Sequence, residues 1–321
     1  MGRASDAERA PTIADSGAES AHARRRLAIE IDHEAGIATR RTPDWLRTGI
    51  KSPGFIRFCL HAAGLWRRAC RNALDIRIVE HDLPLPGLDP AFDGFTLLHL
   101  SDLHIDFTDA CLPAVLERVN KVEYDVCVMT GDFRAKTYGA IDAALDGMRA
   151  LCAGLHGPMY AVLGNHDSIR MAAPLQAIGV RVLLNDSVEL RRGDAAVTLA
   201  GIDDAHFFGL DDADAAARER RAGTPSILLS HSPEAYRDAQ RVGFDAMLCG
   251  HTHGGQICLP GGIPMVLDAR MPRRLGRGRW QYRNMIGYTS AGAGTSIVAA
   301  RLNCPPEITL HRLRKFVESL A

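Results

Sequence analysis

Five short polar clusters, each placed directly after an apolar run, constrain the fold of this chain more than any other feature. The apolar runs cover residues 95–100, 126–130, 159–163, 227–229 and 246–249, and their length and composition indicate buried strands. One His or Asp after a strand is usually a turn or cap residue, but strand ends that deliver several such residues to one sheet edge form a metal site. The repetition therefore favours a metal centre. The clusters are Asp102-Leu103-His104, Gly131-Asp132, Gly164-Asn165-His166-Asp167, Ser230-His231-Ser232 and Gly250-His251-Thr252-His253.

The spacing within two clusters supports the same interpretation. Asp102 and His104 are two residues apart, as are His251 and His253. In an extended chain, side chains two residues apart point to one face, so each pair is expected to face one site. The glycines before the clusters, such as Gly164 and Gly250, would allow a tight turn and a close approach of the backbone.

Taken in order, the clusters read D-x-H, G-D, G-N-H-D, a single H and G-H-x-H, and this pattern resembles the calcineurin-like metallophosphoesterases. The resemblance runs from about residue 74 to about residue 313. Two further stretches, at 254–260 (GGQICLP) and 303–308 (NCPPEI), are similar to the bacterial phosphodiesterase branch of that family. That branch includes enzymes similar to one class of UDP-2,3-diacylglucosamine pyrophosphatase.

The resemblance implies two divalent metal ions and assigns their ligands. Asp102, His104 and His253 would hold one ion, Asn165, His231 and His251 would hold the other, and Asp132 would bridge them. Sites built from His, Asp and Asn accept Mn, Fe, Zn or Co, so the sequence leaves the identity of the metals open.

The resemblance also assigns residues that act beside the metals. His166 would contact a phosphate oxygen or protonate the leaving group. Asp167 could orient the His166 imidazole, although an N-cap for the following helix is an equally good interpretation. His99 is expected to be a satisfied core histidine, and His206 is expected to lie in a surface turn rather than to touch substrate.

Related enzyme classes are separated by residues that this chain does not have. Protein Ser/Thr phosphatases carry G-D-x-V-D-R-G and G-N-H-E, whereas Ala135 and Asp167 stand at positions where those motifs differ. Purple acid phosphatases place a Tyr three residues after the bridging Asp, where this chain has Ala135. Small-molecule phosphodiesters or pyrophosphates remain as substrates.

Composition limits the partners and the compartment. The 38 basic and 38 acidic residues balance, which argues against nucleic-acid binding. Eight cysteines without a C-x-x-C pair indicate a reduced protein. The apolar runs are shorter than the ~20 residues of a membrane span, and the acidic residues after Arg24-Arg25-Arg26 interrupt any export signal. We expect a cytoplasmic protein, either free or peripheral on the inner face of the cell membrane.

The chain divides into three parts. Residues 1–44 are expected to be disordered or loosely helical, and residues 45–73 form a basic helical region. Within it, 54–71 is expected to be one amphipathic helix with Phe55, Phe58 and Trp66 opposite several arginines. This helix either docks on the catalytic domain or lies on an anionic membrane, and the absence of carboxylates slightly favours the membrane.

Residues 74–321 are expected to form the catalytic domain, in which strands and helices alternate. The resemblance implies a four-layer αββα sandwich, with two mixed sheets between outer helices. Further strands are expected at 76–80, 180–184, 188–191, 197–200, 285–289, 295–299 and 307–310, and helices at 112–121, 141–153, 168–178, 212–221 and 233–241.

The functional prediction is a dimetal hydrolase that cleaves a phosphodiester or pyrophosphate bond, with a lipid-linked nucleotide sugar at a membrane surface as one substrate. A soluble cyclic-nucleotide or general phosphodiesterase is the alternative. A non-catalytic binding module is less favoured, because all seven ligand positions hold competent side chains. The leaving group and the oligomeric state stay open.

Overall fold

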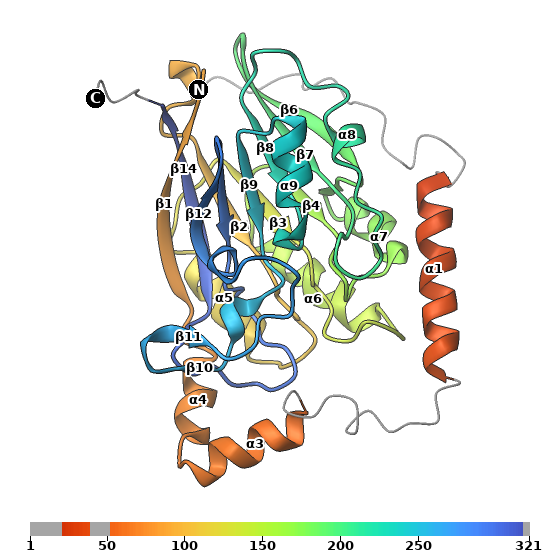
Figure 1. The fold of residues 1–321 in the computed structure, drawn as a ribbon, viewed down its shortest axis with the longest axis vertical. Coiled ribbons are helices and arrows are strands. Elements are labelled where there is room, and N and C mark those ends of the chain that lie inside the picture. The colour runs from red at the N-terminus through yellow and green to blue at the C-terminus, as the bar shows by residue number, and fades with distance from the viewer. Residues whose placement is uncertain (1–20, 39–51, 317–321) are drawn as a thin grey trace.

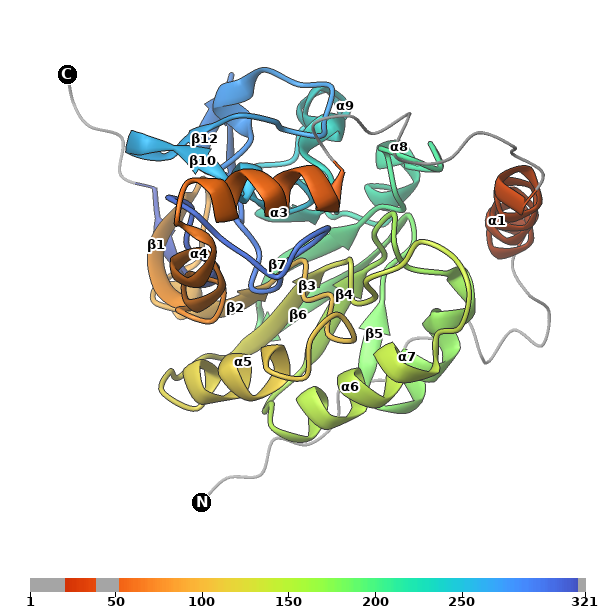
Figure 2. The same cartoon turned by 90° about the horizontal axis from the view of Figure 1, so that it is seen from below.

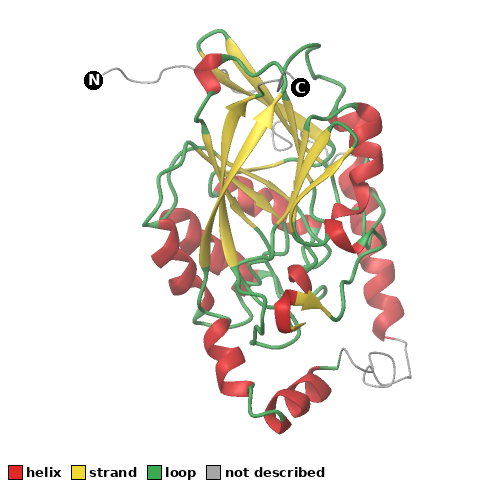
Figure 3. Ribbon diagram, turned by 60° about the vertical axis from the view of Figure 1, so that its left-hand side comes forward, coloured by secondary structure: helices red, strands yellow, loops and turns green. Residues whose placement is uncertain are grey.

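The computed structural model describes residues 21–38 and 52–316. Two six-stranded sheets pack face to face, and helices cover their outer faces (Figures 1 and 3). The predicted four-layer αββα sandwich of two mixed sheets is confirmed.

The first sheet carries the N-terminal half of the polar clusters. Its neighbours are parallel except for β14 and β2, which run antiparallel. Helices α5 (Cys111–Val119), α6 (Asp142–Ala153) and α7 (Ala172–Ala177) cover its outer face. The strands, in spatial order, are β1 (Arg77–Leu85), β14 (Glu307–Lys315), β2 (Thr96–Leu100), β3 (Val126–Thr130), β4 (Met159–Val162) and β5 (Val180–Val182).

The second sheet carries the remaining clusters. Its inner strands are parallel, and each edge strand is antiparallel to its neighbour. Helices α8 (Ala213–Ala216) and α9 (Tyr236–Val242) pack on its outer face. The strands, in spatial order, are β12 (Gly278–Tyr282), β13 (Met285–Thr289), β9 (Ala246–Cys249), β8 (Ser226–Leu229), β7 (Ala195–Gly201) and β6 (Asp186–Arg192).

Short elements complete the connections. Strands β10 (Cys258–Leu259) and β11 (Ile263–Pro264) pair as a separate small ribbon. The 3₁₀ turns are η3 (Pro90–Phe92), η4 (Ile169–Met171), η5 (Pro233–Ala235), η6 (His253–Gly255), η7 (Pro260–Gly262) and η8 (Arg273–Leu275).

The central strands are buried on both faces, which explains their continuous apolar runs. In β3, Val126 and Val128 pack into the layer between the sheets, while Cys127 and Met129 pack under the helices. Packing on both faces therefore fixes the ends of these strands, and with them the positions of the polar clusters that follow.

Some sequence predictions of elements are wrong. Residues 295–299 form an irregular loop rather than a strand, and β12 was not predicted. The helix expected at 212–221 is confined to α8, because the chain from Ala217 to Gly223 forms turns.

The helix expected at 54–71 is in fact two helices, α3 (Pro53–Ala62) and α4 (Trp66–Asn72). Gly64 between them has a φ of +69°, a left-handed conformation that interrupts helical geometry and suits glycine. On α3, Leu60 is buried against Val298 and Ala300, whereas Phe55 and Phe58 are exposed. The apolar residues of α3 therefore fall into two groups, one packed against the protein and one exposed on its surface.

A further helix, α1 (Ala21–Ala38), lies in the segment for which disorder or loose helix was expected. For residues 21–38 the helical alternative holds rather than disorder, and the rest of residues 1–44 lies outside the described residues. Figures 1 and 2 show α1 on a different side of the molecule from α3 and α4. In the described part of the chain, no helix has both the length and the apolarity needed to cross a membrane.

Candidate metal centre

All seven predicted ligands follow strands, and the strands end at one edge of the paired sheets. Asp102 and His104 follow β2, Asp132 follows β3, and Asn165 follows β4, all in the first sheet. From the second sheet come the residues after β8 and β9, which are His231, His251 and His253. The carboxyl ends of parallel strands are the usual place for a ligand in an α/β protein.

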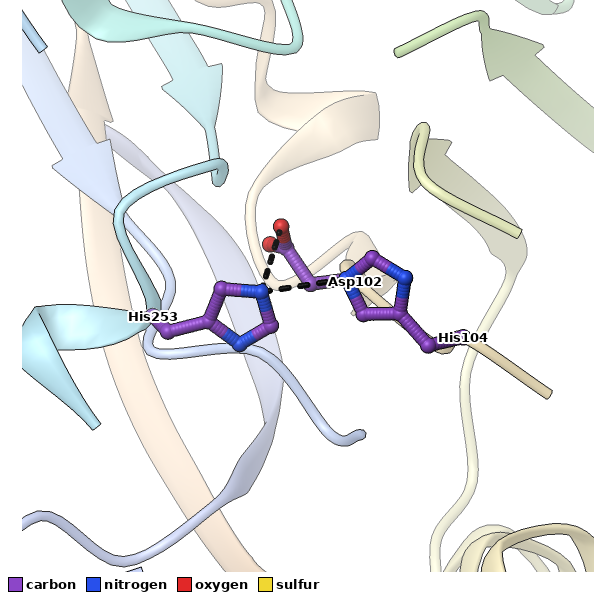
Figure 4. Close-up of side chains that lie close together, drawn as sticks. All are labelled: Asp102, His104 and His253. Carbon is purple, nitrogen blue, oxygen red and sulfur yellow. Dashed lines mark hydrogen bonds and ion pairs between the residues drawn. The ribbon is translucent and has the colours of Figure 1, made fainter. Parts of the chain in front are cut away.

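One group of ligand atoms comes from Asp102, His104 and His253, which are all buried (Figure 4). The Nε2 atoms of His104 and His253 are 3.1 Å apart, and His253 Nε2 lies 3.5 Å from Asp102 Oδ1. Two imidazoles and one carboxylate therefore converge on one point, as the ligands of one ion would.

The second group comes from Asp132, His231 and His251, with Asn165 beside them. His231 Nε2 lies 3.4 Å from Asp132 Oδ2, 3.1 Å from His251 Nδ1 and 3.0 Å from Asn165 Oδ1. Asp132 Oδ2 also lies 3.7 Å from His104 Nε2 of the first group. The Asp132 carboxylate therefore stands between the two groups.

Backbone carbonyls accept a hydrogen bond from one ring nitrogen of each of three histidines. His104 Nδ1 donates to Arg134 O at 2.8 Å, His231 Nδ1 donates to Thr130 O at 2.7 Å, and His251 Nε2 donates to Asp268 O at 2.6 Å. Because a carbonyl can only accept, each of these nitrogens carries a proton, and the other nitrogen of the ring has a lone pair for a metal whenever the ring is neutral.

Burial and neighbouring charge set the protonation of the centre. Burial lowers the pKa of His104 to about 4 and that of His251 to about 3, so both rings are neutral, as metal ligands must be. Burial also acts to lower the pKa of His231, but the charge and hydrogen bond of Asp132, together with the charges of Asp102 and Asp204, outweigh it and raise this pKa to about 10. Without metal, His231 and Asp132 form a buried ion pair.

The backbone at five ligands is left-handed, so the extended geometry expected for the two pairs is wrong. The φ angles are +51° at Asp102, +40° at His104, +56° at Asp132, +70° at His251 and +50° at His253. Each such residue costs about 1–3 kcal/mol and persists only where its surroundings hold it. Asp102 and His104 still reach one group, whereas His251 and His253 serve different groups.

Two glycines allow this close packing. A Cβ at Gly250 would overlap Ser101 Oγ and Asp102 Oδ2, and one at Gly164 would overlap Asp132 Oδ1. No side chain fits at either position, which confirms the predicted close approach.

His166 lies at the edge of the centre, while Asp167 has a different role from either that was predicted. The His166 side chain is 21% exposed, and its Nε2 lies 4.0 Å from Asp132 Oδ2. The Asp167 carboxylate accepts the backbone N–H groups of Asp132 (2.7 Å), Phe133 (2.9 Å) and Gly164 (2.9 Å). Ser168 is the N-cap of the turn that follows. Asp167 therefore fixes the loop of Asp132, and it neither orients His166 nor caps a helix among the described residues.

A cavity of about 400 Å³ opens over the centre, with Asp132, Asn165 and His166 on its polar side. This size suits a small organic ligand. The apolar side of its lining comes from Ile56 on α3, from the loop after β7 and from loops that precede η8 and follow β13; its further members are Phe207, Ile257, Met265, Val266, Ile297 and Val298.

His206 lies in a turn, as expected, but that turn borders the cavity. His206 lines the cavity, its ring is 4.1 Å from that of His251, and its Nδ1 lies 3.1 Å from Glu234 Oε1. No sequence signal pointed to it, because Glu234 is 28 residues away along the chain. The prediction for His99 is confirmed: it is wholly buried, with Nε2 2.8 Å from Thr130 Oγ1.

Comparison with known proteins gives a consistent match. The family model of the calcineurin-like phosphoesterases matches residues 95–255, which include all seven ligand positions. The uncharacterized metallophosphoesterase YkoQ of Bacillus subtilis is 27% identical over 256 residues, or 77% of this chain and 93% of that protein. Phosphodiesterase YaeI of Escherichia coli is 27% identical over 240 residues, or 68% of this chain and 82% of that protein. Among solved structures, the Haemophilus influenzae NAD nucleotidase aligns with 62% of this chain and 45% of its own, at 14% identity and a TM-score of 0.41.

Proposed function

Because the chain belongs to the calcineurin-like phosphoesterase family, we propose that its buried centre binds two divalent metal ions and hydrolyses a phosphodiester or pyrophosphate bond. The observation that carries the proposal is the position of the Asp132 carboxylate between two groups of buried ligands. The phosphodiesterase relative supports a phosphoester as the substrate class.

The residues present fit such a metal pair. The donors are imidazole nitrogens, carboxylate oxygens and one amide oxygen, a set that suits Mn, Fe, Zn or Co. When bound, a metal pair supplies two positive charges for the phosphoryl oxygens and lowers the pKa of a coordinated water. The neutral Asn165 limits the negative charge that faces an anionic substrate.

In this proposal His166 serves the leaving group. Its ring is open to the cavity and lies beside Asp132, so it can reach a phosphoryl group held above that carboxylate. From this position His166 can have one of two roles: it can protonate the leaving oxygen, or it can donate a hydrogen bond to a phosphate oxygen.

The substrate in our proposal carries an apolar group, as a lipid-linked nucleotide sugar does. The apolar side of the cavity supports this choice, because Met265, which is 56% exposed, and Ile297 extend it to the surface. A soluble cyclic-nucleotide phosphodiesterase is the second candidate, since the polar side of the cavity would serve that substrate equally well.

We also propose that α3 and α4 rest on an anionic membrane beside the mouth of the cavity. These helices contain no carboxylate, and Arg57, Arg67, Arg68 and Arg71 are exposed on them. Phe58 is 69% exposed on α3, while Ile56 of the same helix lines the cavity. Arginines over anionic headgroups and aromatic side chains in the interface form a favourable combination.

A substrate panel with added Mn²⁺ tests the function. We expect hydrolysis of bis(p-nitrophenyl) phosphate and faster hydrolysis of UDP-2,3-diacylglucosamine in anionic vesicles, with both activities lost in a chelator. Faster hydrolysis of a cyclic nucleotide than of the lipid-linked substrate would favour the soluble phosphodiesterase. No hydrolysis of any phosphoester under metal-replete conditions would refute the proposal.

A further inference from the structure

Helix α1 reaches the metal centre through one arginine that is wholly buried. Arg26 Nη1 donates to Asp203 Oδ1 at 2.7 Å, and Nη2 donates to the carbonyl oxygens of Gly164 (3.2 Å) and Asp167 (3.1 Å). Asp203 follows β7 of the second sheet, and the two carbonyls belong to the loop after β4 of the first sheet. One side chain from outside the matched family region therefore joins the ligand-bearing ends of both sheets.

Glu30, one turn further along α1, binds the same loop of the first sheet. Its carboxylate accepts from Ser168 Oγ at 2.6 Å and from the backbone N–H of Ile169 at 2.8 Å. It also accepts from Arg26 Nε at 3.0 Å, which fixes the guanidinium in its plane. The loop is thus held before and after Asn165 and His166.

The same helix supports one wall of the cavity. The Arg26 guanidinium lies 3.3 Å from the centre of the Phe208 ring, and the His33 ring packs 5.1 Å from that of Phe207. Phe207 lines the cavity, as does the neighbouring His206. Both the metal-ligand loop and the substrate-facing loop therefore rest on α1.

We propose that α1 is a clamp for the metal centre and that Arg26 is its positioning residue. Arg26 sets the loop of Asn165 and His166 against the ligands His231 and His251 that the second sheet delivers. The inference rests on the proposed metal site, but it is independent of the lipid-linked substrate and of the membrane.

The chemistry of the contact requires arginine. A guanidinium has several N–H donors in a fixed plane, so it can donate to Asp203 and to two carbonyls at once. The ammonium of lysine is a compact charge that cannot reach all three acceptors in this geometry. A displacement of about 1 Å in a catalytic group can lower a rate by about 10²-fold, so a loop held at this precision has a direct effect on turnover.

The test compares three variants of the full chain. Arg26→Met combined with Asp203→Asn removes the guanidinium and the charge of its partner Asp203, while Glu30 keeps its hydrogen bonds from Ser168 Oγ and the backbone N–H of Ile169. Arg26→Lys keeps the charge but not the fork. Arg25→Met is the matched control, because Arg25 is exposed on the same helix. The readouts are kcat and KM for bis(p-nitrophenyl) phosphate, bound Mn²⁺ per chain, and amide hydrogen exchange of residues 164–169 in metal-free protein.

For the double variant we expect kcat to fall by about 10–100-fold with little change in KM. Bound Mn²⁺ should fall, and exchange at 164–169 should rise while the strands stay protected. Arg26→Lys should show the same changes to a smaller extent, and Arg25→Met none.

A folded double variant with normal kcat, Mn²⁺ content and exchange would overturn the proposal. If that variant does not fold, a folded Arg26→Lys protein that matches the wild type in all three readouts would overturn it. If the wild type hydrolyses no phosphoester, the proposed function fails, and the exchange and Mn²⁺ measurements still decide whether the clamp exists.

Discussion

The two sides of the cavity differ in almost every physical property. The metal side is buried, charged and held in left-handed backbone conformations at ligands such as Asp102 and His253. The apolar side is built from half-exposed side chains such as Met265 and Ile297, and part of it comes from α3. The first side is suited to one reaction, because its geometry is fixed by many contacts. The second is open to solvent at Met265 (56% exposed) and Ile297 (47% exposed), whereas Val298 beside them is wholly buried.

The largest effect is expected on the metal side, from Asp132→Asn. The amide loses the charge and one of the oxygens that stand between the two ligand groups, so activity should be abolished and bound metal should fall. Metal analysis of the purified variant, beside its activity on a soluble diester, makes the measurement. Full activity with two ions per chain would show that Asp132 does not join the groups.

His166→Ala should have the next largest effect. If His166 transfers a proton to the leaving group, kcat falls by about 10²–10⁴-fold while metal content is unchanged. The loss should be smaller for nitrophenyl esters, whose leaving group needs no proton. Equal losses for good and poor leaving groups would instead assign His166 to phosphate positioning.

A pH dependence of stability is expected from histidines that support the metal side from within the first sheet. Burial lowers the pKa of His99 to about 3 and holds that of His311 well below its ordinary value. Below pH ~6.5 both rings are protonated in the unfolded chain but stay neutral in the folded protein. Their contribution to the free energy of unfolding is therefore complete above that pH and is lost as the pH falls. The expected slope is about 1.4 kcal/mol per pH unit for each histidine.

Chemical denaturation of wild type and His311→Gln between pH 7 and pH 5 makes this measurement. The variant lacks one titrating ring, so its free energy of unfolding should fall less steeply with acidification. Identical slopes would mean that the pKa of His311 does not change on folding.

On the apolar side, Met265→Ser should act only on substrates with an apolar group. Loss of a partly exposed contact of this size weakens binding by about 1 kcal/mol, or about fivefold in KM. KM for a small diester without an apolar group should stay unchanged. Equal changes in KM for substrates with and without an apolar group would mean that Met265 does not contact the apolar group selectively.

The smallest effects concern α3. Phe58→Ala should weaken sedimentation with phosphatidylglycerol vesicles without lowering thermal stability, because Phe58 is exposed. Each nearby arginine adds about 1 kcal/mol that salt screens, whereas the aromatic contribution persists in salt. Leu60→Ala is the contrasting variant, since it opens the contact with Val298 and should lower stability. If wild-type protein does not sediment with anionic vesicles at low salt, the proposal that α3 and α4 rest on a membrane is refuted.

The sequence predicted the metal side better than anything else, and the reason is local. Each ligand directly follows an apolar run, so strand positions and ligand positions come from the same pattern. The left-handed backbone at Asp102 was not predictable, because it depends on packing against residues such as Gly292 and Gly294, which are far along the chain.

The clamp was missed for a related reason. Arg26 stands among other arginines in a polar segment, and its partners Gly164 and Asp203 are 138 and 177 residues away. No periodicity distinguishes a buried arginine from a solvated one when its partners are so distant. The place of His206 beside the cavity and the turn at Gly64 were not predicted for similar reasons, since contacts and not local pattern decide them.

The place of β14 has a consequence for how the chain is made. This last strand lies between β1 and β2, two strands that the ribosome releases more than two hundred residues earlier (Figure 1). Until β14 is synthesised, β1 lacks its neighbour and both flanking strands present open edges, which are prone to pair with other chains. Glu307, at the start of β14, donates its backbone N–H to Gly292 O, and Gly292 packs against Asp102. While the residues between β2 and β14 are synthesised, this sheet therefore stays open at both strands, and unpaired strand edges of this kind promote aggregation.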